Sequence, residues 1–179
     1  SEAEEALKKV EELVRRVEEE IKRVDERSKD LVRRVERKLE ELVERSKELV
    51  KRLLDMRRRG DIREEEIERV SRESKRLLDE AEKDVRRVVR EIEKLNEDLN
   101  RRVDKVAKEI RDLVRDLKRR GVLREDVERR VRELIERLKR KLEESNRRNK
   151  KLIDELRKRL EEVKRENEKL NEDLERETK

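Results

Sequence analysis

The tripeptide Arg59-Gly60-Asp61 is the segment whose residue types point most directly to a known chemistry, because integrin-type adhesion receptors recognise Arg-Gly-Asp on matrix proteins. The same local pattern recurs at Arg120-Gly121-Val122, with Val122 where the first copy has Asp61. A recognition loop has to project, whereas both segments are expected to be tight links between helices. We therefore interpret Arg59-Gly60-Asp61 as a structural turn, with an adhesion ligand as the less favoured alternative.

Side chains suited to catalysis are scarce. The sequence contains no His, Cys or Tyr, and no base is placed beside its hydroxyl groups. Most carboxylates alternate with Lys and Arg at helical spacing, which is typical of a solvated face. Asp25 is the exception, because it shares an otherwise apolar column with Leu7 and Val43, and we expect it at a core edge near Ser28. With no phosphate loop, nucleotide fingerprint or metal-ligand spacing, the sequence predicts no enzyme, no cofactor and no metal.

Charge dominates the composition without favouring one partner. Charged residues make up 61% of the 179, yet 58 basic and 52 acidic side chains are interspersed and leave a net charge of only +6. The basic runs 57–59 and 147–151 have no aromatic residues with which to stack on bases, which argues against specific nucleic-acid recognition and leaves weak binding at low salt. No apolar run approaches the ~20 residues that cross a bilayer, and no signal-peptide core is present. The start at Ser1 without Met suggests a processed expression product.

Two glycines divide the chain into three segments of nearly equal length. Gly60 and Gly121 each follow basic residues and precede an aliphatic residue and an acidic helix start. This order suits a left-handed glycine after a helix end, so we predict turns at both glycines and helices at about 2–58, 62–119 and 123–177. Ile62 and Leu123 are expected to anchor the helix entries. Asp61 is expected to cap the second helix, with Glu64 completing a capping box.

Apolar residues within the segments repeat every eighteen positions. One column of each segment is Leu13-Leu31-Leu49, Leu77-Leu95-Leu113 and Leu134-Leu152-Leu170. Eighteen residues make five turns of an ordinary α-helix, whereas a heptad repeat would force supercoiling. The repeat therefore predicts an all-α fold: a straight, untwisted, antiparallel up-down-up bundle of three helices of about 57 residues, forming a single domain over 1–179. The width of each apolar stripe suits packing against two neighbours.

Uncharged polar residues interrupt these columns at matching heights. If the helices alternate in direction, residues at one height have numbers that add to about 121 across the first turn and about 242 across the second. On this register the polar residues form two layers, which are Ser46, Ser71, Ser74, Asn167 and Asn171 in one and Ser28, Asn96, Ser145 and Asn149 in the other. Grouping lets buried polar groups satisfy one another, and it penalises other registers. Alternatively, the serines bond back to their own helix and the asparagines reach water.

The whole chain resembles computationally designed parametric helical bundles with buried hydrogen-bond networks. The features that carry the resemblance are the eighteen-residue columns, the reduced alphabet, the Ser/Asn layers and the near-duplicate turns at Gly60 and Gly121. It implies a monomeric structural scaffold without natural activity that needs no partner and is soluble when expressed in a bacterial cytoplasm. Spectrin-like natural repeats are the alternative family, but they usually carry aromatic residues and irregular caps, which are absent here. Self-association into a larger bundle is the alternative function. The flanking column Ser71-Val89-Ala107 favours a further helix, but similar extra columns are scarce on the other two segments.

Overall fold

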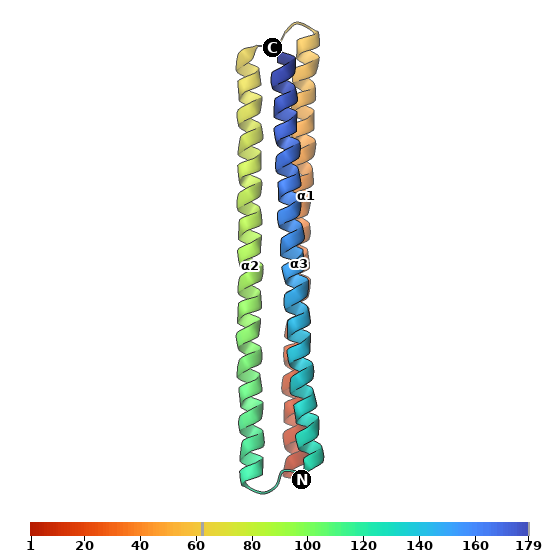
Figure 1. Ribbon diagram of the computed structural model, residues 1–179, viewed down its shortest axis with the longest axis vertical. Coiled ribbons are helices and arrows are strands. Elements are labelled where there is room, and N and C mark those ends of the chain that lie inside the picture. Colours follow the sequence, from red (N-terminus) through yellow and green to blue (C-terminus); the bar gives the residue numbers. More distant parts are fainter. Residues whose placement is uncertain (62, 179) are drawn as a thin grey trace. The chain divides into compact units, whose positions relative to one another are not determined.

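The computed structural model describes residues 1–61 and 63–178, apart from the side chains of residues 177 and 178. Its elements are α1 (Glu2–Arg58), α2 (Glu64–Arg119) and α3 (Glu125–Thr178), which Figure 1 shows with the two connections between them. The described residues contain no strand. The predicted all-α, three-helix class is therefore confirmed.

The helix ends carry the charges that the helix dipole favours. The first turn of α1 contains Glu2, Glu4 and Glu5, and its last turn contains Arg57 and Arg58. Ser1 acts as the N-cap, since its hydroxyl accepts a hydrogen bond from the backbone N–H of Glu4 at 3.3 Å. Acidic residues at the start and basic residues at the end each stabilise a helix by roughly 0.3–1 kcal/mol.

Gly60 ends α1 in a Schellman motif. Its φ of 76° is the left-handed conformation that a side chain disfavours. The Gly60 N–H donates to the Arg57 carbonyl at 3.0 Å, and the Asp61 N–H donates to the Met56 carbonyl at 3.0 Å. These two bonds satisfy carbonyls that the helix end leaves without partners.

The second turn repeats this geometry. Gly121 has a φ of 71°, and its N–H donates to the Lys118 carbonyl at 3.1 Å. The next N–H, of Val122, donates to the Leu117 carbonyl at 3.1 Å. Because Val122 and Asp61 contribute only a backbone N–H to these bonds, the motif accepts either side chain. This explains why the two turns differ at that position.

The starts of α2 and α3 lie two residues later than predicted, and the predicted cap at Asp61 is wrong. α2 begins at Glu64, and the Arg63 carbonyl accepts from the N–H groups of Glu66 and Ile67, so Arg63 occupies the N-cap position. Asp61 lies two residues before this position, and its N–H closes the end of α1. The predicted anchor Ile62 lies outside the described residues. Its counterpart Leu123 packs, partly buried, against the core.

The chain forms two compact units, and each takes a segment from every helix. Unit 1 comprises Ser1–Lys29 and Glu91–Lys151, and unit 2 comprises Asp30–Arg90 and Leu152–Lys179. In unit 1 a buried cluster joins the three helices through residues such as Val14, Ile110 and Leu138. In unit 2 Leu53, Val70 and Leu174 do the same. The single domain expected over 1–179 stays a prediction.

Ion pairs within each unit report the direction and register of the helices. Between α1 and α2, Arg27 contacts Glu91 at 3.1 Å in unit 1, and Lys38 contacts Asp84 at 3.5 Å in unit 2. The two residue numbers in each pair add to about 121, as predicted for neighbours at one height, so these helices run antiparallel. Lys164 of α3 contacts Glu82 of α2 at 2.7 Å, near the predicted 242. In unit 1 the hydrogen bonds of Asn149 with Asn96 and of Asn146 with Asn100 also join α3 to α2, and the residue numbers in each pair again add to about 242. The up-down-up order is therefore present in both units.

Candidate functional site

Asp25 is the acceptor at the edge of the polar layer in unit 1. The Ser145 hydroxyl donates to Asp25 Oδ1 at 2.6 Å, and Arg148 Nη2 donates to Asp25 Oδ2 at 2.7 Å. The Ser145 side chain is fully buried, whereas Asp25 keeps 15% of its side chain exposed. This is the edge position, in the layer of Ser28, that the apolar column of Asp25 indicates. The carboxylate thereby joins α1 to α3.

Asparagine amides join α3 to α2 in the same layer. Asn149 Nδ2 donates to Asn96 Oδ1 at 2.8 Å and lies 3.5 Å from Ser145 Oγ. Three residues earlier, Asn146 Nδ2 donates to Asn100 Oδ1 at 3.0 Å. Asn149 is fully buried, and the other three amides are half-buried. Unit 1 thus contains a network that reaches all three helices.

The layer of unit 2 is smaller. The Ser74 hydroxyl donates to Asn167 Oδ1 at 2.5 Å, and both side chains are 4% exposed. Ser71 and Asn171, predicted at the same height, are half-buried. Ser46 is buried, but among the described residues its hydroxyl has no hydrogen-bond partner. Ser46 and Ser74 are at matching heights in the predicted register, but Ser46 makes no hydrogen bond to Ser74.

Three further buried atoms, all in unit 1, also lack a partner within the described part of the chain. They are Ser28 Oγ, Asn146 Oδ1 and Asn149 Oδ1. Ser28 was expected near Asn96, yet Asn96 accepts from Asn149 instead. Neither Ser28 nor Ser46 bonds back to a helix carbonyl, so the alternative proposed for serines does not describe these two.

Two members of this network, Asp25 and Asn100, are not among the residues predicted for the layer from the sequence. Asp25 had a visible signal, which was its place in the column of Leu7 and Val43. Asn100 had a weaker one, since its column contains only charged neighbours. The register set by the turn at Gly121 nevertheless places Asn100 at about the same height as Asn146.

Glu18 forms the most buried ion pair between α1 and α3 that the described side chains show. Its side chain is 14% exposed, and it accepts from Arg137 Nη2 at 2.7 Å and from Lys141 Nζ at 2.5 Å. Partial burial alone would raise the pKa of Glu18. The hydrogen bonds from Lys141 and Arg137 outweigh it, so the pKa lies below its ordinary value.

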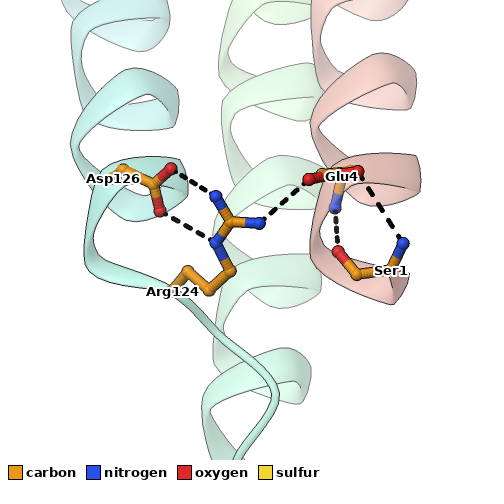
Figure 2. A network of polar contacts seen from close by, with 4 residues as sticks. All are labelled: Ser1, Glu4, Arg124 and Asp126. Carbon is orange, nitrogen blue, oxygen red and sulfur yellow. Dashed lines mark hydrogen bonds and ion pairs between the residues drawn. The ribbon is translucent and has the colours of Figure 1, made fainter.

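A second polar cluster ties the start of α3 to the start of α1, as Figure 2 shows. The Arg124 guanidinium donates to both carboxylate oxygens of Asp126, at 3.1 and 2.7 Å, and to Glu4 Oε1 at 2.9 Å. Glu4 also lies 3.8 Å from the amino terminus of Ser1. The hydrogen bond from Arg124 lowers the pKa of Asp126, and the bonds to Asp126 and Glu4 raise the pKa of Arg124.

The arrangement offers little for catalysis. The hydroxyls that make hydrogen bonds to other side chains, those of Ser74 and Ser145, are buried, so a substrate does not reach them. The described residues contain no group of three or more His, Cys, Asp or Glu able to hold a metal. None of the described helices is long and apolar enough to span a membrane. Arg59 and Asp61 are exposed around Gly60, whose turn is the same motif as at Gly121.

Comparison with known proteins shows which class of fold the chain has. No protein-family model matches the chain, and no curated protein matches it. A solved structure described as a computationally designed three helix bundle is similar, with a TM-score of 0.77 and 16% sequence identity over 98% of this chain and 89% of that one. The resemblance drawn from the sequence is confirmed at the level of the fold.

Proposed function

We propose that this chain is a designed structural scaffold without natural biochemical activity, whose apolar core and polar layers together specify one arrangement of three helices. The observation that carries the proposal is that polar side chains interrupt the apolar columns where they bond across helices. Ser74 bonds to Asn167 in unit 2, and Asn149 bonds to Asn96 in unit 1. The likeness to a designed three-helix bundle supports the same origin.

In this proposal the polar layers select one register of the helices. The turns at Gly60 and Gly121 hold the register within one chain, but a slip of eighteen residues between helices of two associating chains realigns most apolar columns, so the apolar core alone tolerates it. The same slip of α3 from a second chain places its Val131 where Asn149 had been, opposite Asn96. A buried polar group that loses its partner costs roughly 1–3 kcal/mol. The layers therefore penalise the shifted registers that the repeating core permits.

Burial also favours a scaffold of one chain over a self-associating module. The column suggested for a further helix contains Val89, which is 4% exposed, and Ala107, which is 2% exposed. Both are therefore covered within the single chain, and Ser71 is half-buried. Among the described residues Val122, in a turn, is the one large hydrophobic side chain classed as exposed.

The test replaces the two asparagines in the column of Val131 with valine. Asn149→Val with Asn167→Val makes the column of Val131 uniform. We expect this variant to remain helical but to populate several registers, seen as multiple sets of amide peaks in ¹H–¹⁵N spectra and as mixed species by light scattering. The unmodified chain should give one set of peaks and a monomer.

The matched control is Ser28→Val with Ser46→Val, which makes the α1 column of Val10 uniform. Both hydroxyls lack a partner among the described residues, so this variant should keep one register. If the asparagine variant also keeps a single set of peaks, the layers do not specify the register and the proposal fails.

A further inference from the structure

The groove between α2 and α3 in unit 1 has both apolar and basic lining. Val114 and Ile135 are half-buried at this groove, and Val131 beside them is 4% exposed. The groove has a volume of about 520 Å³. Volumes of ~300–1,000 Å³ are usual for small-molecule sites. It therefore offers apolar surface on the scale of one alkyl chain.

The rim of the groove carries excess positive charge. Arg111, Arg115 and Lys118 line it from α2, and Arg132 and Lys139 line it from α3. Two carboxylates lie among them, and one of these, Glu128, is paired with Arg132 at 3.3 Å along α3. Basic side chains thus face one another from opposite sides, where an anion would relieve their repulsion.

A second groove of unit 1 shows that this pattern is not general. The groove between α1 and α2 is also partly apolar, with Val24, Leu95 and Leu99 in its lining, and has a volume of about 400 Å³. Its charges balance, because two acidic and two basic residues line it. Arg102 and Glu20 also pair across it at 3.4 Å, linking α2 to α1. That groove is internally neutralised.

We propose that the α2–α3 groove of unit 1 binds a single-chain anionic amphiphile of the fatty-acid class. The alkyl chain lies above the buried Val131 and covers the apolar surface that the half-buried Val114 and Ile135 leave exposed. The carboxylate head lies among the basic residues of the rim, where Arg111 and Arg115 are one helical turn apart on α2. This inference stands independently of the proposed scaffold function, since a scaffold with or without the site has the same fold.

In the experiment, the methyl groups of Val, Leu and Ile are isotope-labelled, and dodecanoate is added at concentrations below those at which it forms micelles. The chemical shifts of the methyl groups are followed by NMR. We expect saturable shifts at Val114, Val131 and Ile135, with the methyl groups of Val24 and Leu99 unchanged as an internal control. Dodecyltrimethylammonium has the same tail with a positive head, and it should bind at least about tenfold more weakly, since roughly 1.4 kcal/mol of head-group interaction is tenfold in affinity.

The matched variants separate local charge from net charge. Arg111→Glu with Arg115→Glu should weaken dodecanoate binding at least about tenfold. Arg101→Glu with Lys105→Glu makes the same charge change at exposed positions of α2 outside the groove, and it should change affinity less than about twofold, because salt screens exposed charges beyond roughly 10 Å. Far-UV circular dichroism confirms that both variants remain helical.

Several outcomes would overturn the proposal. They are equal binding of the cationic probe, equal shifts in both grooves, equal weakening by both variants, and no saturable binding of dodecanoate. If the Glu variant at 111 and 115 does not fold, Arg111→Gln with Arg115→Gln replaces it, and an unchanged affinity in that variant equally contradicts the site.

Discussion

Unit 1 and unit 2 both place polar side chains inside a three-helix core, but they bond them to different extents. In unit 1 the bonds reach all three helices and include the carboxylate of Asp25. In unit 2 the bond between Ser74 and Asn167 joins two helices, and Ser46 on the third is buried without a partner among the described residues. Equal height in the bundle is therefore necessary for bonding but is not sufficient.

The difference follows from side-chain reach. Packed helices lie about 8–10 Å apart, and a serine hydroxyl extends only one bond beyond Cβ. Each hydrogen bond that joins two helices in these layers has Asn or Asp as at least one partner, as in Ser74 with Asn167 and Ser145 with Asp25. Ser28 and Ser46 lack such a partner. An amide or carboxylate supplies the extra length that two serines cannot.

The largest effect is expected from the apolar core, equally in both units. Leu138→Ala in unit 1 and Leu156→Ala in unit 2 each remove a side chain that is at most 1% exposed. Each should lower the free energy of unfolding by about 2–5 kcal/mol, through lost burial and the cavity left behind. Urea denaturation followed by circular dichroism measures this. Val122→Ala, at an exposed turn, is the control and should change stability by less than about 0.5 kcal/mol.

The next effect should distinguish the two layers. Asp25→Ala removes the acceptor of Ser145 and Arg148, and bonds to a charged group suggest a loss of about 1.5–3 kcal/mol. Asn167→Ala removes one neutral bond to Ser74, with an expected loss of about 0.5–1.5 kcal/mol. Chemical denaturation of both variants provides the comparison. Equal losses would show that the carboxylate of unit 1 adds nothing beyond a neutral bond.

Serines with and without partners should respond with opposite signs. Ser28→Ala and Ser46→Ala each remove a buried hydroxyl without a partner among the described residues, so stability should stay the same or rise by up to about 1 kcal/mol. Ser145→Ala removes a donor to Asp25 and should lower stability by about 1 kcal/mol. Thermal unfolding of the three variants measures these changes. A clear loss in Ser28→Ala would mean that this hydroxyl makes a bond in solution.

The smallest effect is a dependence on pH that Glu18 of unit 1 should contribute. Its folded-state pKa lies below its ordinary value, because Lys141 and Arg137 hydrogen-bond to the charged form and outweigh burial. A depressed carboxyl pKa adds stability above the ordinary Glu value, and that stability is lost as pH falls through the lower folded value. Glu18→Gln should therefore flatten the acid side of the stability curve.

Glu73 of unit 2 is the control for this titration. Its pKa is also lowered, mainly by a hydrogen bond from Arg76 on the same helix and more weakly by Arg45 of α1 at 3.7 Å, and both arginines are exposed. Glu73→Gln should change the acid side less than Glu18→Gln does. The opposite order would contradict the view that the more buried ion pair links stability to pH more strongly than the more exposed one.

The candidate site was predictable in part, and the limits are physical. Ser74 and Asn167 were assigned to one layer from register alone, and the structure bonds them. The same reasoning could not tell that Ser46 stays unbonded, because register gives height along a helix and says nothing of the reach or rotamer of a side chain. Asn100 escaped notice because it lies outside the apolar columns, where packing of the neighbouring helix decides burial.

The sequence by itself determined the three helices, their alternating direction and the two glycine turns, since helix propensity, eighteen-residue columns and left-handed glycines are local properties that repeat along the chain. Only the tertiary structure decided which polar groups bond, that Asp61 closes α1 instead of capping α2, and that the basic residues of α2 and α3 face one another across an apolar groove. These features depend on distances between segments far apart in sequence, and those distances are set when the helices pack.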